Sequence, residues 1–252
     1  MSFIIKNQLD LLIATCLDPD GQFEVIRWIV TQATSTVLQS RNVGYDKFVL
    51  LQTLDAEKLK ILRDEIKEED WFINTARQDT IDEQKETQSI GLVSNLPISN
   101  FNNINTQDIV KTKLYDRYPL LTEFLHSFAN DIGKGWLSRA MIVRLQPHKQ
   151  VYPHNDMGLY YLFRDRYHLV LDSDGSRMKV HGEESTWHNG EVWWFNNNLI
   201  HEAYNDSDKW RIHVIFDVLP YRNFDIVKQL RDKLYFNRQV SPSIIKEDKM
   251  YL

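Results

Sequence analysis

The sequence predicts a mainly β fold with added helices, a sandwich or jelly roll, in a single domain of 252 residues. From Trp136 to Pro220, apolar and polar residues alternate with the period of two that half-buried strands require. Turn signals such as Asp172-Ser173-Asp174-Gly175 divide this stretch into short runs, as in sandwiches and jelly rolls. Before residue 85 the apolar spacing is instead helical. With 42% hydrophobic residues, the chain can bury a full core.

The N-terminal region, residues 1–84, is predicted to be helical. Apolar residues recur at helical spacing from Ile5 to Cys16 and again from Phe23 to Val37. Asp55 can cap a third helix that continues to about Ile66. We expect these helices to cover one face of a sheet, and we assign them no chemistry.

Between the helices and the β-rich part, the pattern is mixed. Residues 75–87 are polar and without periodicity, which predicts a solvated loop or a lid. A strand at 89–93 and an Asn-rich loop at 95–105 should follow. A helical insert at 106–131 then comprises a short helix near 107–115 and a longer one that Gly133-Lys134-Gly135 ends.

Residues 85–220, including that insert, form the predicted core. Its last strand has an apolar face, with Val214 and Phe216, and a polar face, with Arg211, His213 and Asp217. We expect the apolar face to pack under the N-terminal helices and the polar face to line a functional cavity. The predicted strands of this part are 138–146, 150–154, 166–172, 176–181, 191–196, 200–205 and 209–219. A helix near 225–236 and a polar tail make up the C-terminal region, 221–252.

Composition narrows the functional classes. The net charge of −5, with both signs mixed along the chain, offers no basic face for nucleic acid. A single cysteine, Cys16, excludes an internal disulfide and suits a reducing compartment, so a cytoplasmic location is expected. The apolar run 11–16 follows Asp10 and is too short to span a bilayer, so no membrane association is expected.

The tripeptide His154-Asn155-Asp156 is the centre of the functional prediction. On an extended segment, side chains two residues apart project to the same side, so His154 and Asp156 can share a metal ion. His201 opens a later strand and can supply a third ligand. Two histidines and one carboxylate form the facial triad of non-haem Fe(II) oxygenases, which leaves coordination positions open. Alone, the H-x-D pattern is weak, and downstream residues must support it.

Arg211 provides that support. The turn formers Asn205-Asp206-Ser207-Asp208 predict a hairpin that places Ala203 opposite Arg211 and His201 opposite His213. Arg211 would then face the metal, where a guanidinium is costly unless it meets an anion. A dicarboxylate co-substrate would be that anion.

Further positively charged side chains also indicate an anionic ligand in the interior. The pattern R-x-H followed by apolar residues occurs at Arg166 and His168 and again at Arg211, and Arg144 lies on a strand before the metal motif. For each arginine, exposure on an edge strand is the alternative. Together they exceed the charge of one dicarboxylate, which suggests a substrate with its own carboxylate as counter-ion of Arg166, unless an acidic side chain such as Asp217 takes that role. His148, His181 and His188 are interpreted as loop residues, and the run 193–195 as core or cavity wall.

With these residues considered, the chain resembles the aspartyl/asparaginyl β-hydroxylase family of Fe(II)/2-oxoglutarate dioxygenases over about residues 85–220. The likeness rests on Thr87-Gln88-Ser89-Ile90, Pro153-His154-Asn155-Asp156, Arg166-Tyr167-His168-Leu169, Gly190-Glu191, and the series His201-Glu202, Asn205-Asp206, Arg211 and Asp217. The resemblance implies a double-stranded β-helix, a cupin-like jelly roll. It also implies Fe(II), 2-oxoglutarate and dioxygen as cofactors.

The resemblance assigns roles to individual residues. It implies that His154 and His201 are iron ligands, with Asp156 completing the triad, and that Arg211 clamps the distal carboxylate of 2-oxoglutarate. Arg166 and His168 would approach the co-substrate or the substrate. Other members place a Ser on the strand before the metal motif, where this chain has Val143.

The functional hypothesis is an Fe(II)/2-oxoglutarate hydroxylase acting on an amino acid, or on an Asp/Asn-type side chain in a peptide or protein. Its partner is then a small molecule or a peptide that bears a carboxylate or an amide. The alternatives are a cupin-like protein that senses metal and 2-oxoglutarate without oxygenase activity, and an oxygenase for another small molecule.

Overall fold

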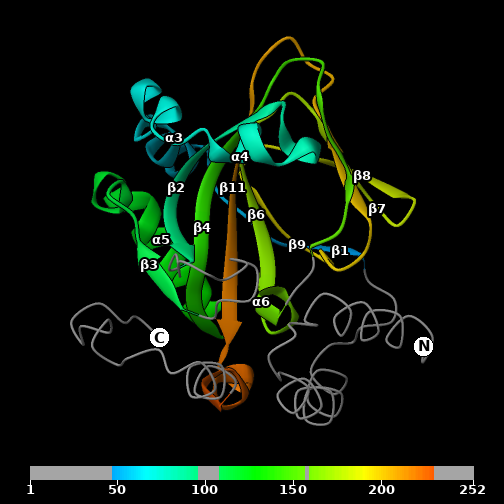
Figure 1. Cartoon of the computed structure of the whole chain (residues 1–252). Helices are drawn as coiled ribbons and strands as arrows, with labels where there is room; N and C mark the ends of the chain where they lie inside the picture. Colours follow the sequence, from blue (N-terminus) through cyan, green and yellow to red (C-terminus); the bar gives the residue numbers. More distant parts are fainter. Residues whose placement is uncertain (1–46, 96–107, 157–158, 230–252) are drawn as a thin grey trace.

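Two antiparallel sheets face each other in the structure, a computed structural model that describes residues 47–95, 108–156 and 159–229 (Figure 1). The large sheet has the order β1 (Phe48–Thr53), β9 (Glu191–Phe195), β6 (Asp165–Asp172), β11 (Arg211–Pro220), β4 (Gly135–Leu145), β2 (Thr87–Asn95), β3 (Ile109–Lys111). The small sheet has the order β5 (Gln150–His154), β10 (His201–Tyr204), β7 (Ser176–Val180), β8 (Glu183–Trp187). The predicted mainly β fold of jelly-roll type is confirmed.

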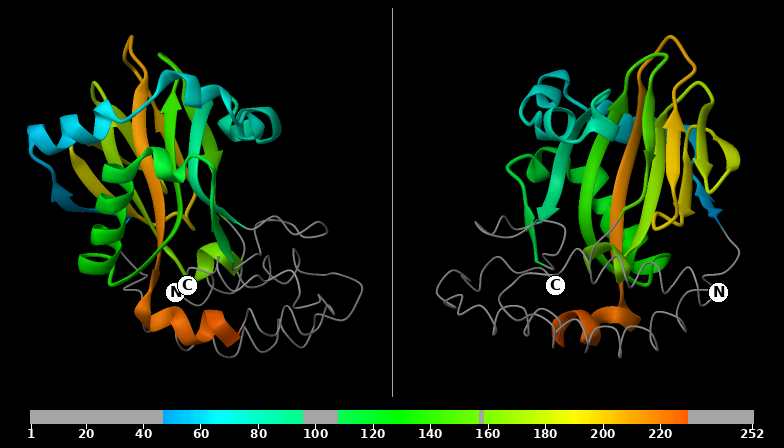
Figure 2. Two further views of the ribbon diagram at one scale, coloured as in Figure 1. Left: turned by 90° about the vertical axis from the view of Figure 1, so that its left-hand side faces the viewer. Right: turned by 45° about the vertical axis from the view of Figure 1, so that its right-hand side comes forward.

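Helices α3 (Ala56–Asp64) and α5 (Pro119–Asp131) cover the outer face of the large sheet. In the left view of Figure 2 they lie on one side of β11, and α4 (Ala76–Thr80) lies on the other side. As predicted, Asp55 caps α3, because its carboxylate accepts a hydrogen bond from the Lys58 amide at 2.8 Å. The predicted helices 5–16 and 23–37 lie outside the described residues.

The apolar face of β11 is buried, as the alternation predicts, but it packs against α5 of the predicted insert rather than only against N-terminal helices. Val214, Phe216 and Val218 are fully buried. The Phe216 ring meets the Phe128 ring of α5 edge-on, with centroids 5.3 Å apart. Burying an aromatic side chain in such a cluster stabilises the fold by roughly 2–3 kcal/mol. The opposite face of β11 is therefore directed to the space between the two sheets.

Three local predictions were wrong. Residues 75–87 hold α4 and a 3-10 turn, Asp82–Gln84, rather than a loop without secondary structure. Residues 109–111 form β3 rather than a helix, because the β-branched pair Ile109-Val110 extends the sheet beside β2. A 3-10 turn, Tyr115–Arg117, follows. Strands β1 and β8 were not predicted, since β8 is mostly exposed and polar and lacks the alternation of a buried strand.

The predicted hairpin between His201 and Arg211 was also wrong. β10 pairs with β5 and β7 in the small sheet, whereas β11 pairs with β4 and β6 in the large one. Asn205 closes the connecting loop: its Nδ2 donates to the carbonyls of Leu145, Gln146 and Lys209 at 3.1, 3.0 and 2.7 Å. The chain therefore crosses from one sheet to the other, and Arg211 contacts Met178 of the small sheet across the gap.

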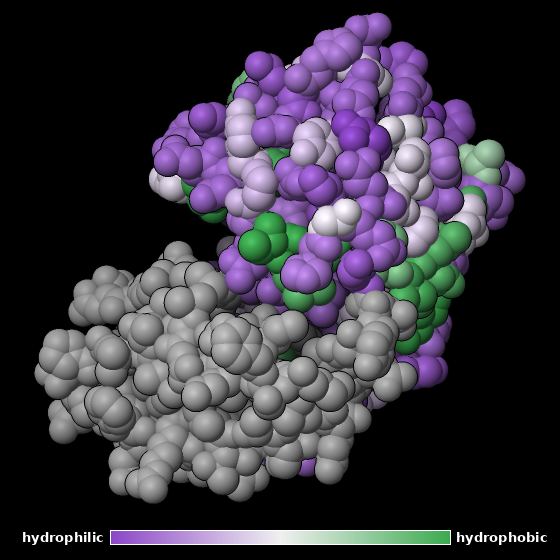
Figure 3. Space-filling view, turned by 90° about the vertical axis from the view of Figure 1, so that its right-hand side faces the viewer, coloured by the Kyte–Doolittle hydropathy of each residue, from purple (hydrophilic) through white to green (hydrophobic). Residues whose placement is uncertain are grey.

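The outer face of the small sheet is hydrophilic, as Figure 3 shows from that side. Its cations pair with neighbouring carboxylates: Arg177 Nε lies 2.7 Å from Asp206, and Lys179 Nζ lies 2.9 Å from Glu202. The two faces of this sheet thus differ, and the functional residues lie on the inner one. Among the described helices, none is both long and apolar enough to cross a membrane.

Candidate active site

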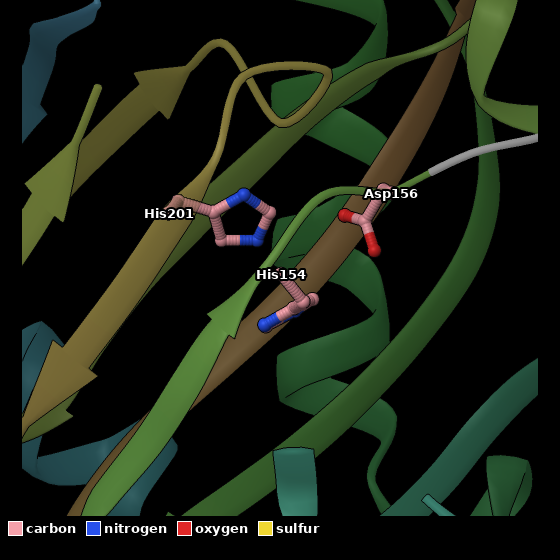
Figure 4. A group of neighbouring side chains, drawn as sticks. All are labelled: His154, Asp156 and His201. Carbon is pink, nitrogen blue, oxygen red and sulfur yellow. The ribbon is translucent and has the colours of Figure 1, made fainter.

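His154, Asp156 and His201 lie close together where β5 ends and β10 begins (Figure 4). His154 ends β5, His201 begins β10, and the two are register partners. Asp156 lies just beyond the end of β5 rather than within the strand. One ligand atom from each residue lies within 4.8 Å of the other two, so the three side chains can share one ion.

Hydrogen bonds to the backbone orient both imidazoles. His154 Nδ1 lies 2.7 Å from the Tyr152 carbonyl oxygen, and His201 Nδ1 lies 2.9 Å from that of Leu199. A carbonyl only accepts, so each Nδ1 carries the proton and each Nε2 keeps its lone pair. This is the tautomer that metal-ligating histidines use. Burial lowers the pKa of His201 to about 4, so this ring is neutral at pH 7.

One oxygen of the Asp156 carboxylate already accepts two hydrogen bonds from the protein. Oδ2 accepts from Arg166 Nη1 at 2.6 Å and from Asn197 Nδ2 at 3.1 Å. Burial is the largest single influence and opposes the charged form, but Arg166, the two histidines and the Asn197 hydrogen bond together outweigh it and hold the pKa of Asp156 below its usual range. The carboxylate is therefore ionised, and among the described residues its Oδ1 makes no hydrogen bond. Asn197 had no signal in the sequence that marked it as a partner.

This donor set fits a divalent transition metal. Two imidazoles and one ionised carboxylate, each fixed by a hydrogen bond, are the ligands that non-haem Fe(II) uses. The residues all come from one side of the site, so other positions around an ion would stay open.

Arg166 has internal counter-ions. Its Nε and Nη2 donate to the two oxygens of Asp217 at 2.8 and 3.0 Å, a paired fork, while Nη1 reaches Asp156. The expectation that a substrate carboxylate balances Arg166 was therefore wrong, and Asp217, the acidic alternative, is its partner. Arg166 positions the candidate metal ligand Asp156. Whether it also touches the co-substrate stays a prediction.

Arg211 differs from Arg166 in having no acid beside it. The residue is 6% exposed, and its guanidinium contacts the His213 ring at 3.1 Å and the Met178 sulfur of the small sheet at 3.3 Å. No carboxylate of the described residues pairs with it, and burial alone lowers its pKa to about 9. A cation desolvated in this way calls for an anion from outside the chain.

Neutral rings line the wall beside Arg211. Burial lowers the pKa of both His168 and His213 well below the usual range, and the charge of Arg211 lowers both further. Trp187 stacks on His213 with centroids 6.1 Å apart, and its buried Nε1 has no acceptor among the described residues. The Nε1 of Trp187 is thus an unused donor on the wall that also includes His213 and Arg211.

For two further arginines, Arg144 and Arg77, the position in the structure differs from the one that the sequence predicted. Arg144 was grouped with the cavity arginines, but it lies on the opposite face of β4, between the rings of Trp71 and Trp210 and bonded to Glu68. Arg77, in the segment predicted as a loop, reaches the cavity face instead. No periodicity in that segment signalled it.

Comparison with known proteins gives a family match. The family model described as aspartyl/asparaginyl beta-hydroxylase matches residues 57–220, which include both sheets apart from β1 and all candidate site residues. No curated protein matches the chain.

Several solved structures resemble the chain at low identity. A 2OG-Fe(II) oxygenase family oxidoreductase from Burkholderia pseudomallei is 14% identical, with a TM-score of 0.47, and the match covers 73% of this chain and 88% of that one. AviO1 from Streptomyces viridochromogenes is also 14% identical, with a TM-score of 0.44 and coverage of 75% and 95%. A Cupin 2 conserved barrel domain protein from Salinispora arenicola is 10% identical, with a TM-score of 0.28 and coverage of 38% and 71%.

Proposed function

Because the chain belongs to the aspartyl/asparaginyl β-hydroxylase family and is a hydroxylase, we propose that it uses Fe(II) and 2-oxoglutarate to hydroxylate a C–H bond of an amino acid, or of an Asp/Asn-type side chain in a peptide. One observation carries this proposal beyond the family match. The space around His168 holds both a triad of fixed metal-ligand side chains and Arg211, a buried arginine with no carboxylate partner among the described residues.

In this proposal His154, Asp156 and His201 hold the metal. Arg211 binds the distal carboxylate of 2-oxoglutarate through its planar fork, and the unused Nε1 of Trp187 is available as a second donor. When bound, the metal and 2-oxoglutarate supply the oxidising chemistry: dioxygen, 2-oxoglutarate and a C–H bond give succinate, carbon dioxide and a C–OH bond.

The protein orients the metal ligands and sets the charge around the co-substrate. Arg166 holds Asp156 ionised and in place, and Asp217 fixes Arg166 in turn. His168 and His213 stay neutral, so they add no positive charge beside Arg211 and leave its charge for the co-substrate. These fixed groups need no rearrangement when an anion binds, which is how preorganised sites favour binding and reaction.

Turnover of the co-substrate tests this function. Protein loaded with Fe(II) and 2-oxoglutarate without oxygen, then exposed to air, should form succinate, and His201→Ala should not. His188→Ala, at an exposed histidine, is the matched control and should behave like the wild type. Binding of 2-oxoglutarate without its consumption would instead identify a sensor.

A further inference from the structure

Arg77 is a second cation at the cavity without an acid bonded to it. It projects from α4, and its Nε donates to Thr87 Oγ1 at 3.2 Å while its Nη1 contacts the Met141 sulfur at 3.3 Å. A hydroxyl and a thioether are weak partners for a guanidinium. Among the described residues, no carboxylate forms an ion pair with Arg77.

The register shows which face these contacts lie on. Thr87 pairs with Leu145, and Leu145 pairs with Arg211. Partners in register share a face, so Thr87 lies on the same side of the large sheet as Arg211. Met141 belongs to that side too, since it lies four residues before Leu145 on the same strand. Arg77 therefore extends from α4, next to β2, into the space between the two sheets. In Figure 1, α4 lies in front of this space.

Arg77 is within electrostatic reach of the candidate metal centre. Burial lowers its pKa to about 10, the charge of Arg166 adds to that shift, and the carboxylate of Asp156 opposes it. Tyr161 and Arg139 act on it as well. Arg139 lies over the Tyr160 and Tyr161 rings, 3.8 Å from a carboxylate oxygen of Asp217.

The charges of this cluster do not balance. Arg77, Arg139 and Arg166 carry three positive charges, while Asp156 and Asp217 carry two negative ones. A divalent metal and the dicarboxylate 2-oxoglutarate cancel each other, and Arg211 adds another positive charge. The loaded site is therefore short of negative charge on the side that α4 covers, where burying unmatched cations is costly.

We propose that Arg77 binds a carboxylate of the primary substrate, and that α4 is a substrate-contacting element that selects anionic over neutral substrates. This inference rests on the proposed function. The planar fork of a guanidinium matches a carboxylate through two parallel bonds, which an amide cannot reproduce. With Arg166 neutralised internally, Arg77 takes the role of the unmatched cation that the sequence had suggested for Arg166.

The test measures binding of a defined panel to wild-type protein loaded with Fe(II) and 2-oxoglutarate under nitrogen. The panel is aspartate, glutamate, asparagine and proline, each with its free α-carboxylate and as the α-amide, plus O-phosphoserine. Calorimetry should find at least one carboxylate that binds at least about tenfold tighter than its amide. Arg77→Gln should remove this discrimination, and Arg77→Lys should restore part of it.

Arg63→Gln, at a half-exposed arginine of α3 outside the cavity, is the control and should keep the discrimination. The proposal is overturned if no carboxylate of the panel binds better than its amide, if Arg77→Gln keeps the preference, or if only the phosphorylated compound binds. Succinate formation by the wild type separates this outcome from failure of the proposed function. If succinate forms but Arg77 does not matter, only the present inference is wrong.

Discussion

Each candidate metal ligand is fixed by a partner that the backbone or a neighbouring strand supplies. The Tyr152 and Leu199 carbonyls set the two imidazole tautomers, and Arg166 with Asn197 holds Asp156. Such support lowers the entropy lost when an ion binds.

Loss of either histidine should therefore be severe. We expect His154→Ala and His201→Ala to weaken Fe(II) binding by more than about 100-fold, because removing a ligand exceeds the 10–100-fold cost typical of losing its supporting partner. Anaerobic calorimetry measures this. Wild-type affinity in both variants would contradict the triad, and wild-type affinity in Asp156→Ala alone would indicate a site of two histidines.

At Arg211, charge and geometry can be separated. Arg211→Lys keeps the positive charge but loses the planar fork, so we expect 2-oxoglutarate to bind about ten- to a hundredfold more weakly, roughly 1.5–3 kcal/mol. Anaerobic titration of the Fe(II)-loaded protein, followed by its visible charge-transfer absorption, gives the affinity. An unchanged titration would remove Arg211 from the site.

For individual residues, short sequence motifs predicted site positions where the chemistry requires particular residue types. His154, Asp156 and His201 follow from their ligand chemistry, and the structure brings them together. Arg77 could not be predicted, since its role depends on α4 crossing to the cavity side. The partner of Arg166 was ambiguous because two acids and a substrate were all possible, and only the three-dimensional position of Asp217 decides between them.

Among the elements, α5 depends on a cap from outside its own sequence. Glu65, just after α3, accepts hydrogen bonds from the Leu120 and Leu121 amides at 2.9 and 2.8 Å. These amides belong to the first turn, where a carboxylate also meets the positive end of the helix dipole. Glu65 thereby joins the two helices that cover the large sheet.

Removing this cap should destabilise the fold. We expect Glu65→Ala to lower the free energy of unfolding by about 1–2 kcal/mol, whereas Glu123→Ala, an exposed position within α5, should change it by less than about 0.5 kcal/mol. Urea denaturation followed by circular dichroism compares them. Equal stability of the two variants would show that the cap contributes nothing.

Alternation and turn signals together predicted most strands, and the predicted bounds of β5 match Gln150–His154. They also predicted β10 and β11, but the turn formers between them wrongly suggested a hairpin, since the two strands belong to different sheets. Turn formers indicate that the chain changes direction, but they do not show which sheet the next strand joins. Here the connecting loop is held by the hydrogen bonds of Asn205 to three carbonyls.

For the molecule as a whole, the gap between the sheets is lined by polar side chains, and His168 and His213 are buried there in the neutral form. His168 and His213 have pKa values well below the usual range, whereas the unfolded chain protonates them below about pH 6.5. The unfolded state then binds more protons, so stability is lost as pH falls below that value.

Metal-free protein should show this dependence between about pH 6.5 and 5, a window above the usual titration of carboxylates. Each such histidine contributes up to about 1.4 kcal/mol per pH unit to the fall in unfolding free energy. His213→Asn should reduce the slope by about one proton, while the exposed control His188→Asn should not. Urea denaturation across this range measures the slope, and a flat profile in the wild type would argue against neutral burial.

The central claim is that this fold reduces dioxygen with 2-oxoglutarate as co-substrate. The most direct test supplies the Fe(II)-loaded protein with 2-oxoglutarate under ¹⁸O₂ and analyses the succinate by mass spectrometry. We predict one ¹⁸O atom in each succinate, at a rate that requires Fe(II) and is lost in His201→Ala. Bound 2-oxoglutarate that is recovered intact, or succinate without ¹⁸O, would contradict the assignment as a dioxygenase.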